Sequence, residues 1–164
     1  MDIQELSKYF VYEKETGNII WAINLKGPAK VGQIAGSKHI KGYVQIGLNG
    51  KTYLAHRIAM IMSGYNVNQK DQIDHINGNR SDNRLENLRL ATHAENCQNA
   101  SKRKDNRSGF KGVGFDKRHQ KWRARIGANG TQKWIGYFNT LEEAHAAYCK
   151  AAKELHGQFA KTSP

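Results

Sequence analysis

The sequence predicts an α+β protein made of two small domains. Short runs of alternating polar and apolar residues fill the N-terminal part, residues 9–53, and favour β-strands. Three further runs of this kind, followed by one amphipathic helix, occupy residues 109–160. Residues 101–108 contain four basic side chains and no large apolar one, which is typical of a linker. We therefore expect domains at 1–100 and 109–160, joined by a basic linker at 101–108.

The N-terminal part carries a strong β-hairpin signal. Residues 42–48 alternate and lead into Asn49-Gly50, a pair that favours a type I′ turn, with residues 51–54 as the return strand. Residues 54–62 then have the spacing of a short amphipathic helix, which Gly64 is expected to end.

The central stretch, residues 71–100, is polar and rich in asparagine. Asp74 and His75 stand at the end of a predicted strand. A helix is expected to begin at Thr92, because Thr92 and Glu95 have the spacing of a capping box.

The C-terminal block is the most regular part of the chain. Its strands are predicted at 111–115, 121–127 and 132–138, with a turn at 128–130. A helix follows from about residue 141, with Thr140 and Glu143 as a capping box and Gly157 as its end. Its apolar face is expected to comprise Ala144, Ala147, Tyr148, Ala151, Ala152 and Leu155.

The net charge of +12 is concentrated in the C-terminal part. Residues 1–100 hold 12 basic and 9 acidic side chains, whereas residues 101–164 hold 14 basic and 5 acidic ones. A compact basic segment of this kind indicates a partner that is a polyanion, most often nucleic acid.

Composition also excludes two classes of protein. No apolar run approaches the roughly 18 residues of a membrane helix, and the N-terminus lacks the features of a secretory signal. Cys97 and Cys149 are two distant cysteines and do not make a disulfide framework. We therefore expect a cytoplasmic protein with no membrane partner.

The second predicted strand of the C-terminal block separates its side chains by character. Alternation places Trp122, Ala124 and Ile126 on one face and Arg123 and Arg125 on the other. The apolar face can meet the helix. The two guanidinium groups face solvent about 7 Å apart, a spacing that suits phosphates or guanine edges.

Four motifs in this block resemble the plant ethylene-response-factor type of DNA-binding domain, in its phage form. They occur in family order at residues 108–113, 121–126, 134–140 and 142–148. The resemblance implies a three-stranded antiparallel sheet that lies in the DNA major groove and is backed by one helix. The DNA contacts that it implies fall on Lys111, Arg123, Arg125, Lys133 and Trp134.

One family position departs from this pattern. Phe115 stands where the family has an arginine, two residues after the Gly-Val pair, so base preference does not transfer.

The central stretch contains the parts of a small nuclease site. Phosphodiester hydrolysis needs an activated water and a cation that neutralises developing charge. Asp74, His75, Asn87 and Asn96 together supply such parts, since carboxylate and amide oxygens suit a hard ion such as Mg²⁺ and the imidazole of His75 suits the general base. Each residue alone has an ordinary structural explanation as a turn, cap or half-buried polar residue. Their order along the chain is what favours a catalytic site.

That order resembles the HNH endonucleases, more narrowly the phage and intron-encoded homing type. The resemblance covers residues 9–100 and centres on the motif at 73–97. It implies a β-β-α unit around one metal ion, with Asp74 and Asn96 as metal ligands and His75 as general base. Asn87 would fix the loop and orient His75.

Two departures shape the expected metal site. Asn96 replaces the final histidine of the motif, and its amide oxygen favours Mg²⁺ or Mn²⁺; His93, one turn earlier, is an alternative ligand. The paired cysteines of a structural zinc site are absent, so we expect one divalent ion and no structural zinc.

The sequence thus predicts a homing-type, phage-encoded DNA endonuclease that acts in the host cytoplasm, as a monomer, on double-stranded DNA. Two alternatives stay open. One is a non-catalytic DNA-binding regulator with a decayed nuclease motif, and the other is a nuclease of structured RNA.

Overall fold

The computed structural model describes residues 2–27, 29–100, 102, 105–128 and 130–162. The chain forms two compact units, Met1–Ala91 and Thr92–Pro164. The division lies between Ala91 and Thr92, directly before helix His93–Asn99. The domain limits of 1–100, 101–108 and 109–160 remain predictions. Residues 101, 103 and 104 of the predicted linker, and Asn129 of the predicted turn, lie outside the described residues.

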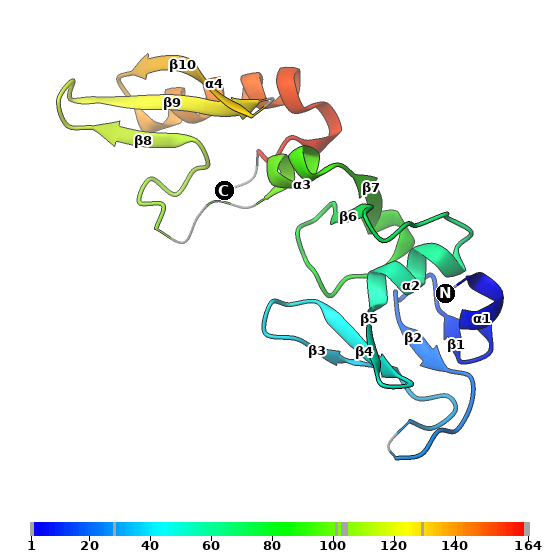
Figure 1. The fold of residues 1–164 in the computed structure, drawn as a ribbon. Helices are drawn as coiled ribbons and strands as arrows, with labels where there is room; N and C mark the ends of the chain where they lie inside the picture. The colour runs from blue at the N-terminus through cyan, green and yellow to red at the C-terminus, as the bar shows by residue number, and fades with distance from the viewer. Residues whose placement is uncertain (1, 28, 101, 103–104, 129, 163–164) are drawn as a thin grey trace. The chain divides into compact units, whose positions relative to one another are not determined.

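The first unit contains small antiparallel sheets and two short helices (Figure 1). In chain order its elements are α1 (Ile3–Ser7), β1 (Phe10–Tyr12), β2 (Ile19–Trp21), β3 (Ser37–Lys38), β4 (Val44–Leu48), β5 (Lys51–Leu54), α2 (Ala55–Met62), β6 (Gln72–His75), the 3-10 helix η1 (Leu85–Asn87) and β7 (Leu88–Ala91). Strands β1 and β2 pair with each other, β3, β4 and β5 form a three-stranded sheet, and β6 pairs with β7.

The predicted hairpin turn is confirmed between β4 and β5. Asn49 and Gly50 have φ angles of 50° and 73°, as the two central positions of a type I′ turn require. The apolar face of α2 buries Ile58, Ala59 and Met60 in the core of this unit, together with residues of α1, β1, β2 and β4. The hairpin and α2 are thus packed in the core directly before the segment that contains β6, η1 and β7.

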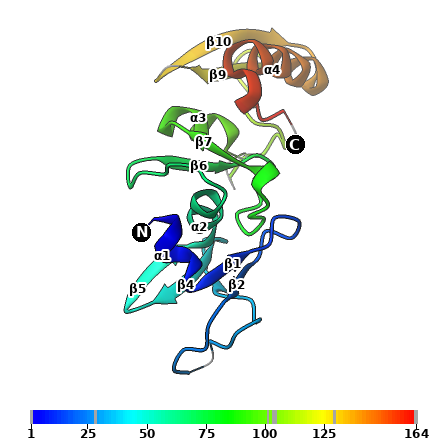
Figure 2. The same ribbon diagram turned by 90° about the vertical axis from the view of Figure 1, so that its right-hand side faces the viewer.

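The second unit contains the three-stranded antiparallel sheet and single long helix that the sequence predicted. Its elements are α3 (His93–Asn99), β8 (Val113–Asp116), β9 (Lys121–Ala128), β10 (Thr131–Phe138), α4 (Leu141–His156) and the 3-10 helix η2 (Gly157–Phe159). The strand order is β10-β9-β8, and α4 packs on the sheet (Figure 2). Both capping boxes, at Thr92 and Thr140, are confirmed.

The buried face of α4 differs from the predicted one at its last turn. Ala144, Tyr148, Ala152 and His156 are buried at a strict spacing of four, whereas Leu155 is 40% exposed. The expectation for Leu155 was therefore wrong. His156 takes the inward position because its Nε2 lies 2.7 Å from the carbonyl oxygen of Gly127, which satisfies a polar group at the edge of the core.

The described part of the chain has no helix with both the length and the apolar character needed to span a membrane.

Candidate active site and nucleic-acid interface

Asp74 and His75 end strand β6, and both side chains are buried. Their strand pairs with β7 so that Asp74 lies opposite Arg89 and His75 opposite Leu88. Nε and Nη2 of Arg89 donate to Oδ2 of Asp74 at 2.8 and 2.6 Å. A carboxylate that is 4% exposed needs such a partner, because an isolated buried charge is strongly unfavourable. The hairpin thus holds a preoriented carboxylate beside the histidine.

The imidazole of His75 is oriented by Asn83, whose side chain is also buried. Oδ1 of Asn83 lies 3.3 Å from Nε2 of His75, and the amide nitrogen of Asn83 faces the carbonyl oxygen of Ser81 at 3.5 Å. An amide oxygen accepts hydrogen bonds, so Asn83 orients the imidazole in the tautomer that is protonated at Nε2.

Two aromatic rings pack around His75. His56 on α2 lies edge-on to it with ring centroids 5.1 Å apart, and Tyr43 lies 5.9 Å away. Burial, with smaller contributions from His75 and Arg57, lowers the pKa of His56 to about 3. Burial also lowers the pKa of His75, and the hydrogen bond that Oδ1 of Asn83 accepts opposes this shift. Both imidazoles are therefore neutral at neutral pH, the form in which His75 can accept a proton.

Asn87 holds the loop between β6 and η1. Its Oδ1 accepts from the backbone N–H of Asn77 at 2.9 Å, and its Nδ2 donates to the backbone carbonyl of Asp82 at 2.8 Å. The Asp82 carboxylate accepts hydrogen bonds from Arg84 and Asn77, and those from Arg84 chiefly lower the pKa of Asp82 to about 2. The loop that contains Asn83 is consequently fixed at both ends.

Asp74, His75 and Asn87 are thus brought together by the first unit, whereas Asn96 and His93 stand on α3 in the second. Cys97 and Cys149 are both free cysteines. Within the described ranges, no group of three or more His, Cys, Asp and Glu side chains could by itself hold a metal ion.

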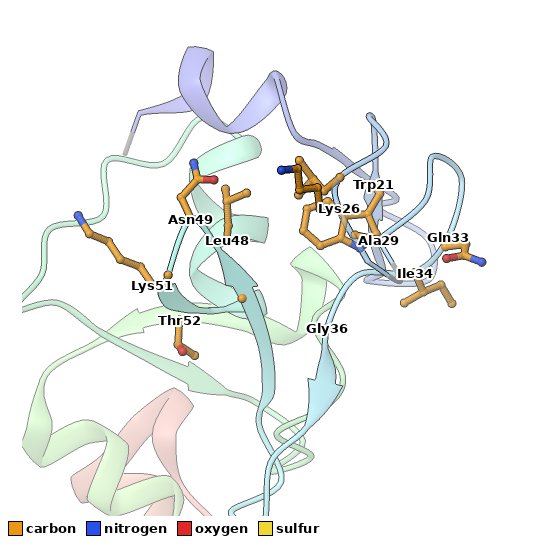
Figure 3. Close-up of a pocket in the computed structure, with 13 residues that line it drawn as sticks. Trp21, Lys26, Ala29, Gln33, Ile34, Gly36, Leu48, Asn49, Lys51 and Thr52 are labelled. Carbon is orange, nitrogen blue, oxygen red and sulfur yellow. The ribbon is translucent and has the colours of Figure 1, made fainter.

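An open groove of 880 Å³ lies elsewhere in the first unit (Figure 3). It runs beside the β4–β5 hairpin, and Trp21, Lys26 and Lys51 are among its lining residues. Asp74, His75 and Asn87 do not line it. The groove is therefore separate from the candidate catalytic residues.

The sheet of the second unit presents a basic and aromatic face. On β9, Ala124 and Ile126 are buried while Arg125 is exposed and Arg123 half-exposed, so the predicted alternation is confirmed. Trp134 on β10 lies opposite Arg125 and is 55% exposed. These three side chains share the face of the sheet that α4 does not cover.

The other two predicted DNA contacts lie elsewhere. The register places Lys133 opposite Ile126, hence on the side of the sheet that faces α4. Lys111 precedes β8, and its ammonium donates to backbone carbonyls at the end of α3. The structure therefore groups Arg123, Arg125 and Trp134, but not Lys111 and Lys133.

Sequence reasoning missed Tyr137, which lies opposite Arg123 on the same face. Its hydroxyl lies 3.1 Å from Oδ2 of Asp116 and 2.9 Å from Nδ1 of His119, and its ring packs edge-on against Trp134. Strict alternation from Trp134 would place Tyr137 on the opposite face of the sheet. The bulge between Trp134 and Gly136 shifts the register and brings Tyr137 to the same face.

Comparisons with known proteins match both parts of the chain. Residues 53–98 match the HNH endonuclease family, and residues 108–158 match the AP2 domain. Protein 3.8 of Escherichia phage T7 is 42% identical over 89 residues, which are 54% of this chain and 73% of that protein. The chain belongs to the HNH endonucleases. This HNH endonuclease also carries a DNA-binding domain of the AP2 type.

A solved structure that covers 95% of this HNH endonuclease is described as DNA binding and cleavage by the HNH homing endonuclease I-HmuI. The sequence identity is 20% and the TM-score 0.45, with 90% of that chain covered. The matched HNH region includes the residues around His75, together with His56 and Asn83, to which sequence reasoning gave no role.

Proposed function

We propose that this chain is a homing-type endonuclease that hydrolyses phosphodiester bonds of double-stranded DNA with one divalent metal ion. The observation that carries the proposal is the arrangement at the end of β6. There a buried, neutral His75 is oriented by Asn83 and stands next to the Arg89-paired carboxylate of Asp74. A neutral imidazole with one nitrogen fixed is suited to take a proton from water.

His75 acts in this proposal as the general base. Its imidazole accepts a proton from the attacking water while the water oxygen bonds to phosphorus. The bond from phosphorus to the leaving oxygen breaks, and that oxygen gains a proton from solvent. Asn83 orients the imidazole, and Asn87 supports the base by holding the loop on which Asn83 lies.

The donor chemistry of the proposed ligands fits a hard divalent ion. Asp74 offers carboxylate oxygens and Asn96 an amide oxygen, and Mg²⁺ commonly uses one or two such ligands plus water and substrate phosphate. Mn²⁺ accepts the same oxygens, and His93 is an alternative ligand on α3. When bound, the ion would supply positive charge to the scissile phosphate and the leaving oxygen.

The AP2 domain would hold the target DNA. Arg123, Arg125 and Trp134 share one exposed face, which supports contacts to the phosphates and bases of a groove. Lys133 would contribute from the edge of the sheet. We propose that the protein acts as a monomer on DNA, and the phage relative supports action inside an infected bacterium.

Cleavage of supercoiled phage and plasmid DNA tests the catalytic assignment. The wild-type protein would be compared with His75→Ala, in Mg²⁺, in Mn²⁺ and in EDTA. The matched control is His145→Ala, which replaces a histidine that stacks on Phe110 in the second unit. We expect metal-dependent open circles from the wild type and the control, and none from His75→Ala, with DNA binding retained by all three.

The opposite results are equally informative. Cleavage by His75→Ala at the wild-type rate would overturn the assignment of the base. Binding without cleavage by the wild type, across metals and substrates, would support the non-catalytic regulator instead. Tighter binding of duplex RNA than of duplex DNA would support the RNA nuclease.

A further inference from the structure

Lys111 directs its ammonium at the end of helix α3 rather than into solvent. Nζ donates to the backbone carbonyls of Ala100 at 2.6 Å and Gln98 at 2.7 Å, and lies 3.5 Å from that of Cys97. The ammonium group has three N–H donors, so these carbonyls can use all of them. Burial lowers the pKa of Lys111, as expected for an amine withdrawn from water.

A cation at the C-terminal end of a helix stabilises that helix. The last four carbonyls of a helix have no partner within it, and the helix dipole places partial negative charge there. Helix α3 has seven residues, too short to be stable in isolation. Its N-terminus is held by the capping box of Thr92 and Glu95, and Lys111 holds the other end.

The backbone of Lys111 is itself fixed to the AP2 core. Gly112 follows it with a φ of 74°, and a Cβ at this position would lie 2.4 Å from the ring of Tyr148 on α4. The carbonyl of Gly112 accepts from the backbone N–H of Arg125 on β9 at 2.9 Å. Helix α3 also contacts η2, which follows α4 (Figure 1). The lysine therefore joins α3 to the sheet and helix that form the DNA-binding domain.

We propose that Lys111 is a positioning residue, which anchors helix α3 on the AP2 domain and thereby sets the placement of Asn96, and that it is not a DNA contact. This inference rests on the proposed function in one respect, namely that Asn96 is a metal ligand. It gives the AP2 domain a second role, because the domain that binds DNA then also carries and orients a part of the catalytic site.

The two roles of Lys111 predict different salt dependence of DNA binding. A lysine that contacts a phosphate releases counterions, so its loss lowers the slope of log K against log salt by about 0.9. A lysine that caps α3 contributes nothing to that slope. Arg125→Gln provides the matched control, since Arg125 lies on the exposed face of the same domain.

The experiment uses the full chain with Lys111→Met, Lys111→Arg and Arg125→Gln. DNA binding is measured in EDTA over a range of salt, amide hydrogen exchange is followed in residues 96–100, and turnover is measured at saturating DNA over a range of Mg²⁺. For Lys111→Met we expect an unchanged salt slope, exchange in α3 faster by roughly tenfold or more, and a higher Mg²⁺ requirement. Lys111→Arg should restore much of the protection, because it keeps a cationic donor.

Several outcomes would overturn the inference. A slope for Lys111→Met that falls as far as that of Arg125→Gln would make Lys111 a DNA contact. Unchanged exchange in residues 96–100 would remove the anchoring role, and this readout does not depend on cleavage. If α3 loses protection while turnover and Mg²⁺ requirement stay as in the wild type, the anchor is real but the catalytic role of Asn96 in the proposed function fails.

Discussion

Oδ1 of Asn83 lies 3.3 Å from Nε2 of His75, and this contact orients the imidazole of the candidate general base. We predict that Asn83→Ala lowers turnover at saturating DNA by roughly 10- to 100-fold, the usual effect of losing a group that orients a catalytic residue. Asn83→Asp keeps an acceptor for Nε2 and should retain more activity than the alanine variant. DNA affinity should stay unchanged in both. Wild-type turnover by Asn83→Ala would show that the imidazole is oriented by other groups.

The buried His56 makes the folded state sensitive to acid. The pKa of His56 is lowered, chiefly by burial, from 6.5 to about 3. Between these two pH values His56 is therefore protonated in the unfolded chain but neutral in the folded chain. Stability should be full above pH 6.5 and decline toward pH 3, by up to about 1.4 kcal/mol per pH unit for one histidine. His75, whose pKa is lowered in the same direction, adds to the decline.

Urea unfolding at a series of pH values tests this effect in His56→Gln. The variant should show a shallower loss of stability on acidification than the wild type. His39→Gln, a change close to the surface, is the control and should follow the wild-type curve. A His56→Gln curve as steep as that of the wild type would mean that other groups cause the acid sensitivity.

The ion pair between Asp74 and Arg89 should have a large effect on stability. Their side chains are 4% and 13% exposed, so removing the cation takes away the positive charge that Arg89 places beside a buried carboxylate. We expect Arg89→Met to lower the free energy of unfolding by roughly 3 kcal/mol. The double variant Asp74→Asn with Arg89→Met should lose less than the sum of the two single variants. Additive losses would show that the pair is not coupled.

The register of the AP2 sheet predicts unequal roles for two of its cations. Arg125 lies opposite Trp134 on the exposed face, whereas Lys133 lies opposite Ile126 on the side of α4. We expect Arg125→Gln to lower the salt slope of DNA binding by about 0.9, and Lys133→Gln to lower it less. Fluorescence anisotropy with labelled duplex DNA measures both slopes. Equal slopes in the two variants would contradict the placement of Lys133.

Local signals made much of the fold predictable. Turn chemistry identified the hairpin at Asn49-Gly50, and capping boxes located the starts of α3 and α4, because each depends on neighbouring residues alone. Helix α1 and strand β3 were not foreseen. They are five and two residues long, too short for a periodic pattern, and are stabilised by tertiary contacts.

The candidate site was predictable only where a motif fixes residue types in order. Asp74, His75 and Asn87 were proposed in this way, and the structure brings them together in the first unit. Asn83 and His56 were not assigned a role, because their contacts with His75 arise when a loop and a helix fold together. A motif can also predict a contact that the fold does not favour. The place of Lys111 in its motif predicted a DNA contact, but its ammonium group donates to backbone carbonyls at the end of α3.

The position at which the compact units divide, between Ala91 and Thr92, has a consequence for exchanging modules between nucleases. A chimaera joined within the basic segment after residue 100 would inherit α3 without the lysine that caps it. A junction just before Thr92 would transfer the helix, its cap and the DNA-binding sheet together. Recombination that preserves activity should therefore favour breakpoints inside the catalytic motif rather than in the segment that looks like a spacer.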